Sequence, residues 1–310
     1  MNSVGILEIE KIKRRIKICD YLTVAQLFLQ DNFLLERKLS FEDIKPRLLG
    51  HWGTCHGINV AYANLKSHFS TNSNFSFILG PGHGFPALQA NLFLDGELLK
   101  VDERATLDKE GIKYICRKFS WPDGFPSHAS PFTPGIITEG GELGYALANA
   151  YGLVLGHPEK TVAVLIGDGE LETATAIDSL NLNNLLSGTR NGTILPILHL
   201  NGYKISGPTI YGRKSERELN EMIRGFGFTP RLIDGENIED FQDALNEKIE
   251  SPFYILKTEK GFGGPNRYHE AHQIPLKNPK TDEGELNKLE EWLKSYHPEE
   301  ILAEIGEQHG

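Results

Sequence analysis

Two glycine-rich turns of the chain each carry a histidine. Residues 51–57 read HWGTCHG and residues 80–84 read GPGHG. Neither stretch has the spacing of apolar residues that is typical of a helix. An imidazole can take up and release a proton near neutral pH, whereas a single histidine between glycines is more often an ordinary surface residue. The rest of the chain must therefore decide whether His51 and His83 do chemistry.

Two apolar runs each end in a residue suited to a metal. GDGE (167–170) follows one run and LNGY (200–203) follows another, so Asp168 and Asn201 lie 33 residues apart. A carboxylate, an amide oxygen and a backbone carbonyl suit Mg²⁺ or Ca²⁺, with phosphate or water as further ligands. Glycines beside Asp168 let the backbone approach a phosphate, and a helix expected to start near Glu170 would direct N–H groups at it. GDG alone indicates only a turn, but the two motifs together predict a site for a metal and a phosphate.

The apolar runs also predict the elements that must position these residues. TVAVLI (161–166) has no polar alternation after its first residue, which is typical of a strand covered on both faces. Further strand-like runs with their turns are FSFILGPGHG (75–84), ILPILHLNGY (194–203), RLIDG (231–235) and FYILKTEKGFGG (253–264). An amphipathic helix is expected over 236–250. Strand, turn and helix alternate, so we expect an α/β fold, a three-layer, doubly wound and mostly parallel sheet.

Ligands of such sheets bind at the carboxyl ends of the strands. His83, Asp168, Asn201 and Lys260 all follow strand-like runs directly. In EGGELGYALANAYGLVLG (139–156), two glycines, Gly140 and Gly141, are expected to open a closely packed helix whose start lies against a bound cofactor. Residues 20–49 look helical, and so does the charged end of the chain. We expect three parts: a helical segment over 1–49, the α/β domain over 50–275 and a helical segment over 276–310.

Composition excludes several other classes of protein. The formal net charge of the 310 residues is −10, and the one short basic run, KIKRRIK (11–17), alternates with isoleucines. We interpret this run as a partly packed helix face, so no nucleic-acid partner is expected. No apolar run is long enough to cross a bilayer, and the start does not resemble a secretory signal. Three widely spaced cysteines favour neither disulfides nor a zinc site, and we expect a cytoplasmic protein.

The order of the motifs resembles that of phosphoketolases. They are HWGT, GPGHG, PSHASPFTPG, EGGELGY, GDGELET, LPILHLNGYKI, PTI, EKGFGGP and HQIPL. The resemblance runs from about residue 20 to about residue 300. Phosphoketolases are thiamine-diphosphate enzymes that cleave xylulose 5-phosphate or fructose 6-phosphate with inorganic phosphate. The resemblance implies a transketolase-like, diphosphate-binding (PP) domain over 50–275, with a truncated interdomain linker in 276–310.

The family's chain carries a second, pyrimidine-binding (PYR) domain and a C-terminal domain that are not found here. The resemblance therefore implies a split enzyme whose site is completed by a separate PYR-domain subunit, in a heteromer such as a heterotetramer. It implies thiamine diphosphate and Mg²⁺ or Ca²⁺ as cofactors and a sugar phosphate as substrate. Two other functions stay open. The partnered site could transfer a two-carbon unit to another acceptor, as a transketolase does, or the chain could be a non-catalytic scaffold subunit.

The resemblance also implies a role for individual residues. Asp168 and Asn201 would bind the metal through their side chains, and Tyr203 through its carbonyl. The cleft where the ketose reacts would be lined by His51, His83 and His272, and Lys260 would meet the charge of the substrate or diphosphate. The cofactor itself would contact Thr54, His83, Gly141, Glu142, Gly167, Asp168, Gly169, Glu170, Asn201 and Lys260.

Three positions depart from the family's pattern. They are Cys55-His56, Phe85-Pro86 and Leu180-Asn181, and each is expected to border the cleft or a subunit interface. Cys55 is interpreted as a small packed side chain rather than a reactive thiol. Two histidines outside the predicted site, His128 and His199, are interpreted as hydrogen-bonded core residues. The sequence HEAHQ, which contains His272, is not a metal triad by itself.

Overall fold

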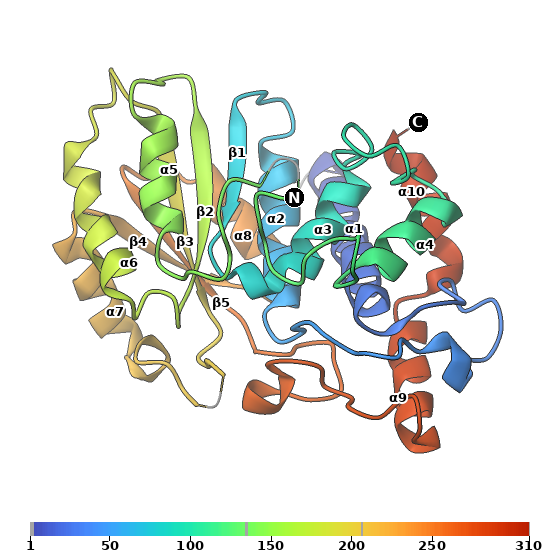
Figure 1. The fold of residues 1–310 in the computed structure, drawn as a ribbon. Coiled ribbons are helices and arrows are strands. Elements are labelled where there is room, and N and C mark those ends of the chain that lie inside the picture. Colours follow the sequence, from blue (N-terminus) through green and yellow to red (C-terminus); the bar gives the residue numbers. More distant parts are fainter. Residues whose placement is uncertain (1–2, 134–135, 206, 310) are drawn as a thin grey trace.

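The computed structural model describes residues 3–133, 136–205 and 207–309, and its centre is a five-stranded sheet (Figure 1). The strand order is β1-β2-β3-β5-β4, and every neighbouring pair is parallel. The strands are β1 (Phe75–Leu79), β2 (Thr161–Gly167), β3 (Thr193–Leu200), β4 (Thr229–Asp234) and β5 (Pro252–Lys257). The parallel α/β sheet predicted from the apolar runs is therefore confirmed.

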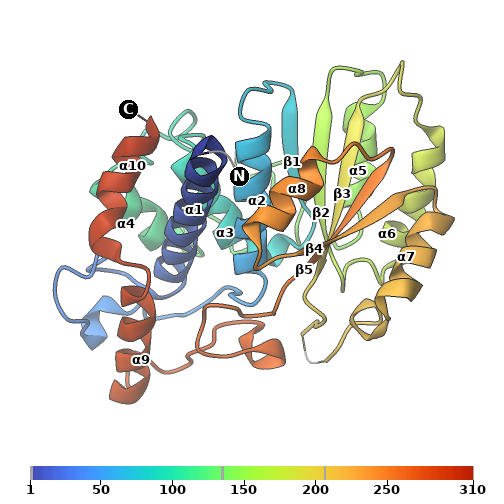
Figure 2. The same ribbon diagram turned by 180° about the vertical axis from the view of Figure 1, so that it is seen from behind.

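Helices cover both faces of the sheet, which explains why β2 is apolar at successive positions. Val162, Val164 and Ile166 of β2 enter one core with α5 (Ala146–Val154), α6 (Ala174–Ser179) and α7 (Glu216–Gly225). The intervening Ala163 and Leu165 enter a second core with α2 (Cys55–His68) and α8 (Ile238–Asn246). Side chains alternate along a strand, so a strand between two helical layers needs apolar residues at every position. Figures 1 and 2 show these two layers from opposite sides.

Further helices pack beyond α2, away from the sheet (Figures 1 and 2). They are α1 (Ser3–Phe28), α3 (Phe85–Leu94), α4 (Lys109–Lys118), α9 (Glu283–Lys294) and α10 (Ile301–His309). Phe28 of α1 meets Trp292 of α9 edge to face at 6.1 Å. Helices α1, α9 and α10 share a core with α2, although the division into three parts stays a prediction. Short 3₁₀ helices are Phe41–Asp43, Gly82–Gly84, Leu180–Leu185, Tyr211–Arg213, Tyr268–Ala271 and Pro298–Glu300.

The first helix differs from the prediction in its bounds. It ends at Phe28, and most of 29–49 is irregular, so the helical prediction over 20–49 was wrong beyond that residue. Asn32 and Leu35 take positive φ angles of 53° and 52°, which a right-handed helix does not allow. The KIKRRIK run lies in α1 with Ile12 and Ile16 buried, as the packed-face interpretation requires. No helix among the described residues is long and apolar enough to span a membrane.

Candidate active site

A cavity of about 480 Å³ lies at the carboxyl ends of the strands. The turns after β1, β2, β3 and β5 supply His83, Asp168, Asn201 and Lys260 respectively. The turn before α2 supplies His51 and Thr54. The full lining is His51, Thr54, Pro81, His83, His128, Gly140, Gly141, Leu143, Gly167, Asp168, Gly169, Glu170, Asn201, Tyr203, Lys204, Ile205, Lys260 and His272. The structure therefore brings together every predicted site residue except Glu142.

Four histidines face one another in this cavity. The ring centroid of His51 lies 5.0 Å from that of His83, 5.2 Å from that of His272 and 5.3 Å from that of His128. Burial lowers the pKa of His51 to about 3 and that of His272 to about 4, and it lowers the pKa of His83 well below its ordinary value. The rings of His51, His83 and His272 are therefore neutral at pH 7, so each offers one N–H donor and one lone pair.

Lys260 lines the cavity and connects the segments around it through hydrogen bonds. Its amine donates to the carbonyls of Tyr203 at 3.0 Å and Lys204 at 3.2 Å, and to Nδ1 of His272 at 2.9 Å. His272 consequently carries its proton on Nε2. Burial lowers the pKa of Lys260 to about 8, although nearby Asp168 opposes this shift. The Tyr203 carbonyl, expected as a metal ligand, thus accepts from an ammonium group here.

Asp168 and Asn201 present oxygen atoms beside this amine. Oδ2 of Asp168 accepts from the Gly202 amide at 2.6 Å and from the Thr209 hydroxyl at 3.1 Å, and Oδ1 accepts from the Gly169 amide at 2.9 Å. Burial raises the pKa of Asp168 to about 6, and these hydrogen bonds oppose the rise. Oδ1 of Asn201 accepts from the Tyr203 amide at 3.1 Å, which orients it.

Glu170, which lines the cavity, connects two glycine turns through hydrogen bonds. Its carboxylate accepts from the amides of Gly144 and Gly167, both at 3.1 Å. Burial raises the pKa of Glu170 to about 7. The turn after β1 leaves room for this group, because a Cβ on Gly80 would lie 2.1 Å from Oε2 of Glu170. Glu170 therefore holds backbone in place at the cavity's edge.

The expected helix starts at the two glycine motifs are wrong. Helix α5 begins at Ala146, well after Gly140 and Gly141, and α6 begins at Ala174 with Thr173 as its cap. The physical reason is that Gly144 takes a φ of +105° and gives its amide to Glu170, so the chain turns instead of coiling. Glu142 is exposed beside this turn and does not line the cavity.

Backbone packs directly on backbone where two motifs meet. A Cβ on Gly82 would lie 2.2 Å from Cα of Gly140, and Ala129 joins both turns by accepting from the Gly140 amide at 2.7 Å and donating to the Gly82 carbonyl at 2.8 Å. This contact places His83 and His128 in the same cavity. Residues 134–135, the end of the PSHASPFTPG motif, lie outside the described residues.

Gly82→Ala is expected to destabilise the protein by about 1–3 kcal/mol, because the new methyl group must displace backbone rather than a mobile side chain. Thermal unfolding measures the change. The matched control is Gly152→Ala in α5, where a Cβ meets nothing within 4 Å and should stabilise the helix by about 0.5–1 kcal/mol. Equal unfolding temperatures for the two variants would contradict this account of the turn.

None of the three departures from the family's pattern lines the cavity, and their expected alternative location, a subunit interface, stays a prediction. The Cys55 thiol is buried and donates to the carbonyl of His51 at 2.8 Å, as its interpretation as a packed residue requires. Phe85 is buried and stacks on Phe119 with ring centroids 6.4 Å apart. Leu180 is in the core, and Asn181 is exposed. None of the six side chains is part of the lining.

The two histidines interpreted as core residues differ from each other. His199 is fully buried, with Nδ1 3.2 Å from the Thr54 hydroxyl and Nε2 2.8 Å from the Thr258 hydroxyl, so it is the hydrogen-bonded core residue expected. His128 instead lines the cavity. Sequence reasoning missed it because its loop has no periodicity; its one signal was a motif shared with phosphoketolases.

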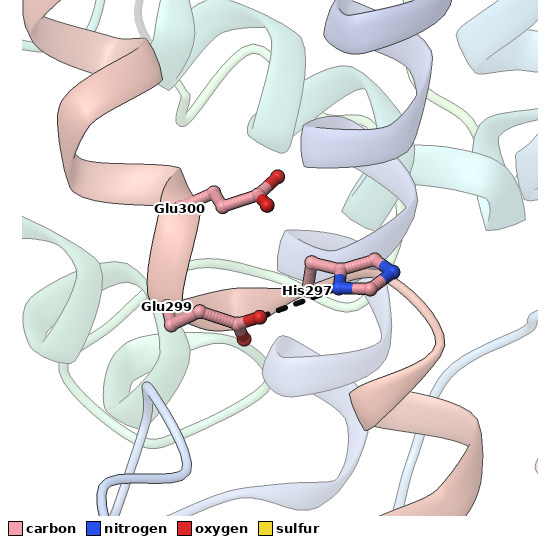
Figure 3. Close-up of side chains that lie close together, drawn as sticks. All are labelled: His297, Glu299 and Glu300. Carbon is pink, nitrogen blue, oxygen red and sulfur yellow. Dashed lines mark hydrogen bonds and ion pairs between the residues drawn. The ribbon is translucent and has the colours of Figure 1, made fainter.

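A second cluster of ligand-type residues lies far from the strand ends. Figure 3 shows His297, Glu299 and Glu300, the one group of three His, Cys, Asp or Glu in the described part of the chain whose side-chain atoms could converge on a metal. All three are exposed; His297 pairs with Glu299 at 3.3 Å and Glu300 with Lys17 at 3.4 Å. Ordinary surface pairing accounts for this cluster.

The parallel sheet and the cavity at its carboxyl ends define an α/β protein of transketolase-like fold. A transketolase from Campylobacter jejuni superposes with a TM-score of 0.67 at 19% identity, over 97% of this chain and 47% of that one. The R525L mutant transketolase from Pichia stipitis gives 0.65 at 19% identity, over 97% of this chain and 44% of that one. These neighbours show the fold.

The sequence family is more specific. The model of the XFP N-terminal domain matches residues 4–253 and 245–309, and the chain belongs to this family. It is similar to a probable phosphoketolase of Brucella suis, with 39% identity over 96% of this chain and 42% of that protein. A probable phosphoketolase of Rhodopseudomonas palustris strain BisB5 is 40% identical over 94% of this chain and 41% of that protein. The chain thus spans about two fifths of the length of these relatives.

Proposed function

We propose that the cavity binds thiamine diphosphate with Mg²⁺ or Ca²⁺, and that the chain is the diphosphate-binding half of a phosphoketolase-like enzyme. The substrate would be xylulose 5-phosphate or fructose 6-phosphate, cleaved to a two-carbon acetyl or glycolyl unit. One observation carries the proposal: a single cavity joins the oxygen atoms of Asp168 and Asn201 to a cluster of neutral histidines. Membership of the XFP N-terminal domain family and similarity to probable phosphoketolases support it.

The residues present fit such a cofactor. Nδ1 of His51 is buried with no hydrogen-bond partner among the described residues, which a bound polar group would satisfy. A Cβ on Gly141 would have its nearest neighbour at 3.9 Å, so open space lies over that backbone. Asp168 and Asn201 supply the hard oxygen ligands that Mg²⁺ prefers. The Lys260 ammonium places a positive charge at this corner, which suits the negatively charged phosphates of the cofactor.

The chain's own side chains would bind and orient the ketose. Thiamine diphosphate, when bound, supplies a carbon nucleophile that adds to the ketose carbonyl. The neutral rings of His51, His83 and His272 can each donate or accept a proton at a substrate hydroxyl. Lys260 holds the His272 ring with Nε2–H free to donate. Leu143 and Ile205 line the same cavity with apolar surface, which would exclude water from the reacting groups.

Exposed apolar side chains at and near the cavity support a partner surface. Leu143 and Ile205, which line the cavity, are 40% and 68% exposed, and Tyr145 and Ile210, which lie close to them in the sequence, are 49% and 56% exposed. Such a group of exposed apolar residues is typical of a surface that another domain covers. We propose a PYR-domain subunit as that partner, in a hetero-oligomer such as a heterotetramer. We also propose a cytoplasmic location, which the three free, buried cysteines support.

The two other functions have less support. Two-carbon transfer to a different acceptor rested on altered residues at the cleft, and none of those residues lines the cavity. A scaffold that had lost catalysis would be expected to have lost some polar cavity residues, yet Asp168, Asn201 and the histidines remain together. Phosphoketolase-like cleavage is therefore the function best supported.

Complementation tests this proposal directly. The chain is co-expressed with a PYR-domain protein encoded nearby, and acetyl phosphate is assayed from xylulose 5-phosphate, phosphate, Mg²⁺ and thiamine diphosphate. Product is expected from the pair and from neither protein alone. Ketose consumption that needs an aldehyde acceptor would favour two-carbon transfer instead. A stable complex that never binds the cofactor would contradict catalysis and leave a scaffold.

A further inference from the structure

His56 forms a buried ion pair that no part of the cavity uses. Its Nδ1 lies 2.8 Å from Oδ2 of Asp20 in α1, and its Nε2 lies 3.7 Å from Oε2 of Glu236 in the turn after β4. The side chains of His56 and Asp20 are 11% and 5% exposed. Oδ1 of Asp20 also accepts from Asn59 at 2.7 Å. An imidazole between two carboxylates is stabilised in its charged form.

The other face of the same ring packs on the turn that carries Lys260. The ring centroids of His56 and Phe262 are 4.8 Å apart, with the planes tilted by 36°. An imidazolium over an aromatic face gains a cation–π contribution. Phe262 comes two residues after Lys260, so His56 contacts the segment that holds the cavity's ammonium group in place.

Direct backbone contacts join this segment to the turn before His56. The Gly261 amide donates to the Gly53 carbonyl at 2.9 Å, and the Trp52 indole donates to the Gly261 carbonyl at 3.3 Å. A Cβ on Gly53 would lie 2.9 Å from Cε of Lys260. The turn that carries His51 and the turn that carries Lys260 thus touch, and His56 lies at their junction.

We propose that His56 is a positioning residue: as a cation held by Asp20 and Glu236, it fixes the turn of His51 and Thr54 against the turn of Lys260. The imidazolium belongs to α2, is paired with Asp20 of α1 and packs on Phe262 of the turn after β5. It therefore connects three elements at one point. Its role in catalysis rests on the proposed function, but its effect on the two turns does not. His56 itself touches neither cofactor nor substrate space.

Protonation of His56 makes the stability of the protein depend on pH in a definite direction. Burial alone would lower its pKa, but Asp20 and Glu236 outweigh burial and raise the pKa to about 10. The positive charge of His56 also contributes to the lowered pKa of His199, near the end of β3. Because the folded pKa is above the ordinary value of 6.5, the stabilisation is complete below about pH 6.5 and is lost as pH rises through about 10. Nitrogen-15 NMR of the histidines should therefore show a protonated His56 at pH 8.

Hydrogen exchange of the free chain tests the positioning role without cofactor or substrate. In His56→Gln, the amides of Gly261 and Trp52 are expected to exchange at least about tenfold faster, because Asp20 is left without its cation. The control is Tyr62→Phe, which removes a 2.8 Å hydrogen bond to Asp95 from the same helix and should leave both amides unchanged. Equal exchange in the two variants, or a neutral His56 at pH 8, would overturn the proposal.

A milder variant decides the matter if His56→Gln does not fold. Glu236→Gln removes only the half-exposed carboxylate and should speed exchange of the Gly261 amide about threefold; an unchanged rate there counts against the proposal. In the complemented enzyme, His56→Gln should lower kcat more than it changes Mg²⁺ binding. If the wild type itself is inactive, the proposed function fails while the exchange data still judge the role of His56.

Discussion

Asp168→Asn is expected to lower the affinity for divalent metal, and with it metal-dependent binding of thiamine diphosphate, by at least about 100-fold. Partners of metal ligands already contribute about 10- to 100-fold to metal affinity, and Asp168 is the charged ligand in this proposal. The substitution also turns an acceptor into a donor. Oδ2 now accepts from Gly202 and Thr209, and an NH₂ group there would oppose two donors. Mn²⁺ binding followed by electron paramagnetic resonance measures the loss in the chain alone, and calorimetry measures cofactor binding in the complemented enzyme.

Thr209→Val is the matched control for that experiment. It removes one hydrogen bond, the 3.1 Å contact from the Thr209 hydroxyl to Oδ2 of Asp168, but keeps the carboxylate. Its effect on Mn²⁺ affinity should be about tenfold or less. If Asp168→Asn binds Mn²⁺ and cofactor as the wild type does, the metal assignment is wrong. If the two variants lose affinity equally, the orientation of the carboxylate matters more than its charge.

The sheet could be predicted from the sequence because a buried strand has a recognisable run of apolar residues. A strand covered on both faces must be apolar at consecutive positions, and 161–166 shows this directly. The same logic predicted the cavity's acid and amide, since carboxyl ends of parallel strands meet at one edge. This step, which places Asp168 and Asn201 side by side, requires only that the two strands before them are parallel neighbours, as β2 and β3 are.

The rest of the site depends on contacts between distant segments. His128 enters the cavity because Ala129 bonds to the turns of Gly82 and Gly140, and no local pattern predicts such bonds. The helix starts near Gly140 and Glu170 were misplaced for a related reason. A glycine turn and a helix start both present free amides, but here the Glu170 carboxylate takes two of them. A side chain 26 residues away thus holds Gly144 in a turn, and helix α5 starts only at Ala146.

The directions in which side chains point could not be predicted from the sequence either. Cys55-His56 was expected to border the cleft or a subunit interface, because the pair departs from the family's pattern directly after HWGT. The first turn of α2 instead directs the thiol back to the His51 carbonyl and the imidazole to the buried Asp20 of α1. Adjacent helical residues point about 100° apart, so neighbours in sequence need not share a site. The fold and the edge of the sheet that carries the cavity can thus be predicted from local sequence patterns. The charged partners of a side chain such as His56 cannot.

Lys260→Met should lower kcat of the complemented enzyme by about 100-fold or more, which is the scale of a group that supports proton transfer. Methionine keeps the length of the side chain but cannot donate. The carbonyls of Tyr203 and Lys204 and Nδ1 of His272 each lose their hydrogen bond. Freed from Lys260, the His272 ring can change its tautomer and orientation, so Nε2–H is no longer held toward the substrate.

The same substitution has a second readout that does not need activity. The positive charge of Lys260 contributes to the lowered pKa of His51, His83, His199 and His272, so removing it should raise all four. NMR titration of the free chain should show the increase most clearly for His272, whose ring it contacts. The control is Lys257→Met, at an exposed lysine that ends β5 just before the turn of Lys260; it should change neither kcat nor these titrations. Loss of activity with unchanged histidine titrations would mean that Lys260 acts on substrate or diphosphate directly rather than through the histidine cluster.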